Sequence, residues 1–499
     1  MPLNLIVVVF DTLRYDAVFG DLAATPNLDR FASESVVFSN AWGEGLPTIP
    51  FRRALYTGRR SYPWDQQEGD RGSFPNLPGW HRIPDSQTTL PEMLYARGYA
   101  TQLVSDVWHQ FKAGQNFVRG FVSWDFLRGQ EGDTYEFSKA SLASGSDLDP
   151  TRVGPASYLY QQRQRGGDDD YFVARIFDRA SAAVQALSGA DPYCLWLESF
   201  SPHEFWDPPF RYADAYYPAP DRPNYIVPQL LNPLPPGTDG ERVSRERRAW
   251  FGTGGFAVGE EPDERDVLRT RALYQGYVTF CDERFGRFLN VLEQTGAMDN
   301  SVVVVLSDHG TEVWDKGHFG KEGARLHPYN TQINLMIHHP DLRRQTRCDV
   351  FAQNQDLAPT LLSLLGIPAP RLDGENLWPA VVDGTQGARD HVVIGWDHWA
   401  SVRDHEWNLI VDTAAPETNL RLYDVQADPG ESDNVAARYP DVVARQLARL
   451  EATIGRPLPA AFLHRPNPLA SSGARPGGIR ESRRQQARLG EGWSGSNQV

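Results

Sequence analysis

Cysteine is scarce in this chain, with three residues among 499: Cys194, Cys281 and Cys348. Their odd number and wide spacing argue against a disulfide framework and against a cysteine-rich zinc module. Long hydrophobic runs are also lacking, because apolar stretches such as 302–306 are far shorter than the roughly 20 residues of a membrane helix. The first apolar run ends at Asp11 with no basic leader before it, so we expect no signal peptide and a cytoplasmic protein.

Positive charge is in deficit: 49 Lys and Arg residues stand against 64 Asp and Glu residues, a net charge of −15. An acidic surface of this kind repels nucleic-acid phosphates and anionic membranes, so we expect neither as a partner. A small anionic substrate would need a locally basic pocket. The sequence carries no signal for an oligomeric state.

Apolar residues are plentiful, at 40% of the chain, and are arranged as short runs rich in β-branched residues, separated by amphipathic segments. Runs that are apolar on both faces are typical of buried parallel strands, and we expect such strands at 4–10, 36–38, 100–105, 193–200 and 301–306. The segments between them predict helices at 25–32, 89–98 and 264–296. This alternation predicts an α/β fold with a large, mostly parallel sheet sandwiched by helices.

The pattern changes after Gly384, where short alternating segments predict a small antiparallel sheet closed by a helix at 440–454. We therefore divide the chain into a catalytic α/β domain (1–384), a C-terminal antiparallel α+β subdomain (385–469) and a disordered tail (470–499). The Pro-rich stretches 207–235 and 462–468 are predicted to be loops or linkers.

Two of the predicted strands end in residues that bind metals. Asp11 directly follows the first strand, and Asp308 and His309 follow the strand 301–306 by one residue. Ligands in open α/β sheets bind beyond the carboxyl ends of the strands, so these side chains can converge. Two carboxylates and an imidazole suit one divalent cation, with Mn²⁺ or Zn²⁺ favoured over Ca²⁺ or Mg²⁺. The alternative is that each aspartate only caps the helix that follows it.

A hydroxyl and a guanidinium lie one helical turn apart at Thr48 and Arg52. If the helix begins near Pro50, both side chains face one side, and the helix N-terminus points at the same place. A hydroxyl attacks only when a metal or base activates it, and an arginine can bind a tetrahedral oxyanion. The alternative makes Thr48 a helix cap and Arg52 a surface residue.

Taken together, these motifs resemble the sulfatase family within the alkaline phosphatase superfamily, over about residues 4–440. The resemblance rests on the strand ending in Asp11, on Thr25-Pro-Asn-Leu-Asp-Arg30, on Thr48-Ile-Pro-Phe-Arg52 followed by Thr57-Gly-Arg59, on Ser201-Pro-His203, on Ser307-Asp-His-Gly310 and on Leu422 to Glu431.

The resemblance implies a role for each residue of this chain that matches a family motif. The resemblance implies metal ligands at Asp11, Asp308, His309 and the nucleophile position Thr48. It implies that Arg52 and Lys321 bind oxyanion charge and that His203 protonates the leaving oxygen or contacts substrate. His109, Lys316 and His318 are candidate residues of the substrate pocket, although Lys316 stands where the family usually has a histidine and His318 is displaced from that position by two.

The chain also departs from the family pattern at its nucleophile. Family sulfatases oxidise a Cys or Ser to formylglycine, but Thr48 carries a β-methyl group and could give only a ketone, so no formylglycine is expected. Superfamily phosphodiesterases use an unmodified threonine. Thr12 also replaces a second aspartate, which favours one metal over two.

The sequence thus predicts a metal-dependent hydrolase that uses Thr48 on a phosphate monoester, a phosphodiester or a phosphonate ester. Two alternatives stay open. One is a sulfoester hydrolase that acts without formylglycine, and the other is a non-catalytic sulfatase-like protein that binds anions. Retention of Asp11, Arg52, Asp308, His309 and Lys321 disfavours the second alternative.

Overall fold

The computed structural model describes residues 2–64, 78–136, 158–218 and 264–460, apart from positions 113, 134, 159, 160, 163, 191 and 386. The predicted C-terminal tail, the linker at 462–468 and most of the Pro-rich stretch 207–235 lie outside these residues. The described part of that stretch contains a short helix, α8 (Phe210–Asp214), where a loop was expected.

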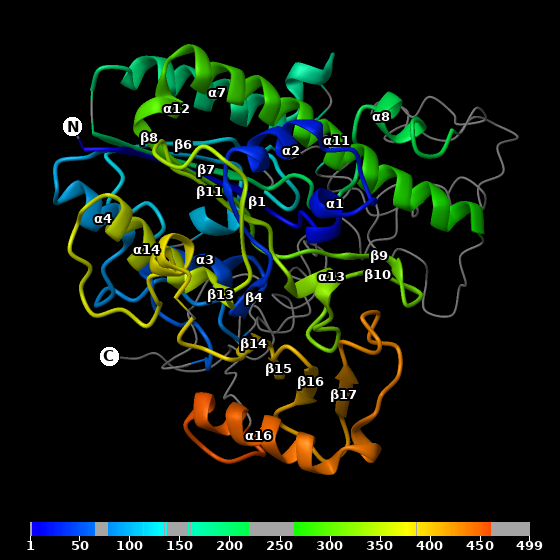
Figure 1. Cartoon of the computed structure of the whole chain (residues 1–499). Helices are drawn as coiled ribbons and strands as arrows, with labels where there is room; N and C mark the ends of the chain where they lie inside the picture. Colours follow the sequence, from blue (N-terminus) through cyan, green and yellow to red (C-terminus); the bar gives the residue numbers. More distant parts are fainter. Residues whose placement is uncertain are drawn as a thin grey trace, which may run out of the picture.

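An eight-stranded sheet forms the centre of the molecule, as predicted (Figure 1). All neighbouring strands in it run parallel except those that flank β11, which is antiparallel to both of its neighbours. In spatial order the strands are β12 (Thr346–Cys348), β2 (Val36–Phe38), β11 (Leu335–His338), β8 (Ser301–Ser307), β1 (Asn4–Phe10), β7 (Tyr193–Ser199), β5 (Ala100–Ser105) and β6 (Ser123–Phe126).

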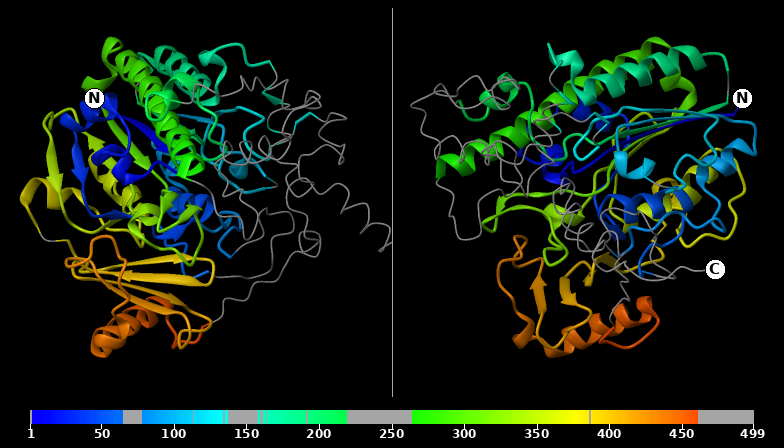
Figure 2. Two further views of the ribbon diagram at one scale, coloured as in Figure 1. Left: turned by 90° about the vertical axis from the view of Figure 1, so that its right-hand side faces the viewer. Right: turned by 180° about the vertical axis from the view of Figure 1, so that it is seen from behind.

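Helices cover both faces of this sheet because its central strands are apolar on both sides. Alternate residues of β1 belong to different cores: Ile6 and Val8 pack on one face, and Val7 and Val9 on the other. The first face carries α2 (Pro26–Ser33), α7 (Phe172–Leu187), α11 (Glu264–Gln294) and α12 (Ala297–Asn300). The second face carries α3 (Thr48–Thr57), α4 (Leu90–Tyr95) and α14 (Leu357–Leu364) (Figures 1 and 2).

Local signals explain where several helices begin and end. Thr89 caps α4 in a capping box with Glu92, and the turn after it contains Gly98 at φ +86°. The helix α3 begins at Thr48, two residues before the expected start at Pro50, because a proline is tolerated within the first turn. It ends at Gly58, whose φ of +64° disfavours other residues.

The C-terminal part forms a separate antiparallel sheet closed by α16 (Pro440–Ile454), at the bottom of Figure 1. Its strands are β14 (Val392–Trp396), β15 (Trp399–Arg403), β16 (Trp407–Asp412) and β17 (Leu420–Asp424). A fifth strand, β4 (Gly45–Leu46), pairs in parallel with β14 and leads directly into α3. The sheet therefore includes residues from both sides of Gly384, and the exact domain boundary stays a prediction.

The remaining short elements connect these layers. They are α1 (Tyr15–Phe19), β3 (Ala41–Trp42), β9 (Glu312–Asp315), β10 (His318–Gly320), α13 (Pro328–Thr331), β13 (Ala352–Gln353) and α15 (Trp378–Asp383). Of the helices that the structure describes, none is both long and apolar enough to cross a bilayer.

Candidate active site

Adjacent parallel strands bring the three predicted metal ligands together. Phe10 of β1 pairs with Ser307 of β8, so Asp11 and Asp308 leave the sheet side by side. With His309 they form a fully buried cluster, in which one ligand atom from each residue lies within 4.8 Å of the others. Neither aspartate caps a helix, because the next helix after Asp11, α1, begins at Tyr15 with Arg14 before it.

The ring of His309 is oriented to offer a lone pair to this cluster. Its Nδ1 lies 2.9 Å from the carbonyl oxygen of Gly310, which can only accept, so Nδ1 carries the proton. Burial lowers the pKa of His309 to about 4, although Asp308 acts to raise it, so the ring is neutral at pH 7. Nε2 then faces Asp11 and Asp308 at 3.8 and 3.6 Å without a proton.

The two carboxylates also have the environment of a cation site. Burial, followed by the charge of Asp308, raises the pKa of Asp11 well above its usual range. A proton at Asp11 thus relieves the repulsion between the two acids, which a bound cation would also do. Asp11 Oδ2 and His309 Nε2 are buried and have no hydrogen-bond partner among the described residues. The donor set therefore fits a divalent cation.

Helix α3 brings Thr48 and Arg52 to the cluster. Nη1 of Arg52 donates to the Thr48 carbonyl oxygen at 3.1 Å and to Asp308 Oδ2 at 2.6 Å. The same nitrogen lies 3.3 Å from Asp11 Oδ2. Thr48 and Arg52 are 2% and 0% exposed, which rules out a surface position for the arginine. One guanidinium nitrogen therefore links the first residue of α3 to both aspartates.

Glu198 is a charged residue of this network that the sequence analysis missed. It lies in β7, is fully buried, and accepts a hydrogen bond from Nε of Arg52 at 2.8 Å. The one available signal was an acidic residue within the otherwise apolar run 193–200. A buried acid in a central strand requires a partner, and Arg52 is that partner.

Lys321 lies at the partly exposed rim of the cluster. Its Nζ donates to Thr12 Oγ1 at 3.3 Å, and Thr12 Oγ1 donates to Asp11 Oδ1 at 2.8 Å. Nζ also lies 2.7 Å from Oε2 of Glu204, a second residue that was missed. Burial acts to raise the pKa of Glu204, but Lys321 and His203 outweigh it and lower this pKa to about 2.

Two predicted histidines lie beside this rim. Nδ1 of His203 is 2.7 Å from the Glu204 carbonyl oxygen. The His203 ring stacks on the ring of Phe200, with 4.1 Å between the ring centroids. Burial, then the charge of Lys321, lowers the pKa of His203, which favours a neutral ring with its proton on Nδ1. Nε2 of His109 lies 3.4 Å from Glu131 Oε2, whose charge also acts on His203.

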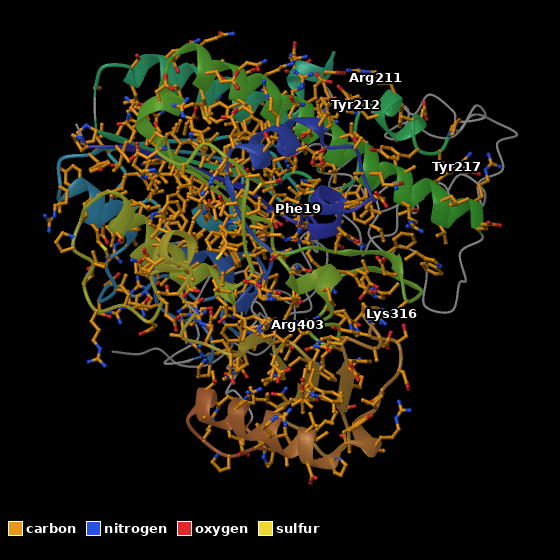
Figure 3. The ribbon with its side chains drawn as sticks, in the orientation of Figure 1. Phe19, Arg211, Tyr212, Tyr217, Lys316 and Arg403 are labelled. Carbon is orange, nitrogen blue, oxygen red and sulfur yellow. The ribbon has the colours of Figure 1, made fainter. Side chains whose placement is uncertain are left out.

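Lys316 and His318, in contrast, make their described contacts away from the cluster. Lys316 lies in the turn between β9 and β10, and its Nζ donates to the Glu431 carbonyl oxygen at 2.6 Å, next to the C-terminal sheet (Figure 3). Nδ1 of His318 lies 3.8 Å from Oε2 of Glu312, and the His318 side chain is about one-third exposed. A substrate-binding role for these two residues stays a prediction.

The charges of the network favour a cation. When all are ionised, four carboxylates and two basic groups give the network a net charge of −2. The carboxylates are those of Asp11, Glu198, Glu204 and Asp308, and the basic groups are those of Arg52 and Lys321. An anionic ester would be repelled by this balance, whereas one divalent cation neutralises it.

A cleft of about 680 Å³ lies next to His109. It is lined by Trp108, Phe111, Lys112, Trp124, Asp125, Phe126, Arg128 and Asp133. Nε1 of Trp108 donates at 2.7 Å to the same Glu131 carboxylate that faces His109. The cleft therefore lies along β6, which contributes Trp124, Asp125 and Phe126 to its wall.

Comparisons with known proteins identify the family and the fold of this chain. The chain is 26% identical to the multifunctional alkaline phosphatase superfamily protein PehA of Trinickia caryophylli, covering 87% of this chain and 91% of the relative. It is 23% identical to an N-acetylglucosamine-6-O-sulfatase of Bacteroides thetaiotaomicron, covering 83% and 79%. The phosphonate monoester hydrolase of Silicibacter pomeroyi superposes with a TM-score of 0.64 at 19% identity, over 90% of this chain and 95% of that one. The sulfatase family model matches residues 3–367, so this chain belongs to the sulfatase family of hydrolases.

Proposed function

We propose that this protein is a metal-dependent ester hydrolase that uses unmodified Thr48 to attack a phosphate monoester, a phosphodiester or a phosphonate ester. The observation that carries this proposal is the buried Asp11–Asp308–His309 cluster, joined through Arg52 to the first residue of α3. The name of the relative PehA and the fold shared with phosphonate monoester hydrolases support phosphorus chemistry.

Asp11, Asp308 and His309 are the residues that would hold the cation. Two carboxylates with one imidazole favour Mn²⁺ or Zn²⁺ over Ca²⁺ or Mg²⁺. When bound, the ion would supply a Lewis acid for activation of the hydroxyl and the ester.

The other catalytic roles, which are nucleophilic attack, charge stabilisation and proton transfer, would fall to residues of the chain itself. The Thr48 hydroxyl releases its proton to solvent and its oxygen forms a bond to phosphorus while the bond to the leaving oxygen breaks. Water then attacks the phosphorus, the bond to the Thr48 oxygen breaks, and that oxygen takes up a proton from the water. Lys321 stabilises negative charge on the non-bridging oxygens, and Arg52 holds Asp308 and the start of α3 in place. A neutral His203 with its proton on Nδ1 offers Nε2 as an acceptor, so it suits leaving groups that need little protonation.

The experiment is an acid quench of the enzyme during turnover of an aryl phosphonate ester, followed by mass spectrometry of the Thr48 peptide. We expect a phosphorus adduct on Thr48, and we expect Thr48→Ala to lower turnover by about three orders of magnitude or more while cation binding persists. Thr57→Ala is the matched control, because Thr57 lies on the same helix and its hydroxyl, within the described ranges of the chain, bonds the Arg53 carbonyl and the Arg59 amide alone. Near-normal turnover by Thr48→Ala would rule out this nucleophile.

A sulfate ester is the second candidate substrate, because the chain is similar to a sugar sulfatase. A panel of aryl phosphodiesters, phosphonate esters and sulfates separates the two. Faster hydrolysis of sulfates would overturn the phosphorus assignment, and hydrolysis of none, without cation binding, would support a non-catalytic protein.

A further inference from the structure

The carboxylate of Glu198 is surrounded by hydrogen-bond donors. Its carboxylate accepts four hydrogen bonds, from Nε of Arg52 at 2.8 Å, Tyr56 Oη at 3.0 Å, Trp196 Nε1 at 3.0 Å and Gln110 Nε2 at 3.1 Å. Every one of these partners is a donor, so the hydrogen bonds favour the ionised carboxylate, against burial, which raises the pKa of Glu198. The residue is 0% exposed and does not belong to the Asp11–Asp308–His309 cluster.

Arg52 separates this acid from the cluster. Its Nε faces Glu198, and its Nη1 faces Asp308 at 2.6 Å and Asp11 at 3.3 Å. A buried arginine this close to a cation site repels the cation, because charges interact strongly where water is excluded. Glu198 offsets that repulsion and fixes the plane of the guanidinium.

We propose that Glu198 is a positioning residue that sets the cation affinity of the Asp11–Asp308–His309 cluster through Arg52. The inference rests on the proposed function, because it assumes that this cluster binds a divalent ion. It goes further by assigning part of the affinity to a carboxylate that does not touch the ion. Groups that hydrogen-bond a metal ligand typically account for about 10- to 100-fold in affinity. Arg52 is such a group for Asp308, and Glu198 acts on that ligand through Arg52.

The test measures the Kd of Mn²⁺ and Zn²⁺ by isothermal titration calorimetry on the full chain after chelation and dialysis. Glu198→Gln keeps the size of the side chain and removes its charge, and we expect the Kd to rise by about 10- to 100-fold. Glu198→Asp keeps the charge on a shorter side chain, and we expect it to bind more tightly than Glu198→Gln. A purely structural role would lower the melting temperature without this order of affinities.

Asp356→Asn is the matched control. Asp356 is also fully buried and also accepts four hydrogen bonds, two from Arg389 at 2.7 and 2.8 Å and two from the backbone amides of Gln353 and Glu375. Its donors, Arg389, Gln353 and Glu375, form no hydrogen bond or ion pair with the cluster in the described part of the chain, so its substitution should destabilise the protein but leave the Kd unchanged.

The outcomes separate this inference from the proposed function. An unchanged Kd in Glu198→Gln, with tight binding by the wild-type protein, would overturn the role of Glu198 alone. The same would follow if Asp356→Asn weakened binding equally. Absence of binding by the wild-type protein would overturn both proposals.

Discussion

At the residue scale, Asp106 illustrates how burial changes a side chain near the site. It follows β5, is fully buried, and accepts hydrogen bonds from the Phe200 amide at 2.6 Å and from Gln130 at 3.3 Å. Burial raises the pKa of Asp106 to about 7, despite these hydrogen bonds and the charge of Arg52, which act to lower it. The folded protein therefore holds a proton at pH 5 that the unfolded chain has released.

This proton has a consequence for stability. A raised native pKa means that stability falls as pH rises from about 4 to 7, because ionisation favours the unfolded state. We expect Asp106→Asn to remove this loss, since the amide oxygen can still accept from Phe200. The melting temperature of the variant relative to the wild type should rise between pH 4 and pH 8.

The control for this experiment is Asp21→Asn at an exposed position, which should follow the wild-type profile. A parallel pair of curves for wild type and Asp106→Asn across this pH range would contradict the expectation.

The residues of the site differ in how well the sequence could predict them. Asp11 and Asp308 could be predicted because each follows a strand with a clear apolar pattern. Glu198 and Glu204 could not be predicted, since the role of an acid inside an apolar strand or a loop depends on the basic group that faces it. For Glu198 that group, Arg52, is 146 positions away in the chain.

At the element scale, the hairpin of β9 and β10 connects the site to the C-terminal sheet. Lys316 in its turn bonds the Glu431 carbonyl oxygen, and Lys321 follows its second strand. The Glu431 carboxylate, which is 1% exposed, pairs with Arg403 and with His327 Nδ1. Glu431 thus joins the C-terminal sheet to the segment that positions Lys321.

We expect Glu431→Gln to lower the free energy of unfolding by about 3 kcal/mol, because the nearly buried Arg403 loses its counter-charge. Urea unfolding measures this change. Asp433→Asn is the control, because the pair of Asp433 with Arg438 is mostly exposed, and we expect a change within about 0.5 kcal/mol. Equal effects of the two substitutions would refute the role assigned to Glu431.

The main strands could be predicted because each is a short run of apolar residues, and the main helices because their apolar residues recur at helical spacing. Five strands of the central sheet (β1, β2, β5, β7 and β8) and α16 were predicted to within a few residues, whereas β6, β11 and β12 were not predicted. The strand β4 could not be predicted, because two residues carry no period and its partner β14 lies about 350 positions away. The start of α3 was also missed, since Pro50 is compatible with several positions in a first turn.

At the scale of the whole molecule, the cation site should act as a cross-link between two halves of the chain. Asp11 and Asp308 are separated by almost 300 residues, and a ligand that binds only the folded state stabilises it by mass action. We expect the melting temperature to rise with the concentration of Mn²⁺ or Zn²⁺ and to fall after treatment with a chelator.

Asp308→Ala should abolish this dependence on the ion, whatever its effect on the melting temperature itself. The measurement is differential scanning fluorimetry over a series of ion concentrations. A variant that keeps the wild-type dependence would place the cation elsewhere in the protein.

The sequence by itself determined the elements of this protein and the chemistry at the ends of its strands, because periodicity and residue type are local properties. It also gives the expectation that no formylglycine forms, since oxidation of Thr48, which carries a β-methyl group, could give only a ketone. Only the tertiary structure decided how charge is distributed around the cluster. That distribution depends on Glu198, Arg52 and Lys321, whose interactions arise only when β7, α3 and the hairpin of β9 and β10 meet in a space from which water is excluded.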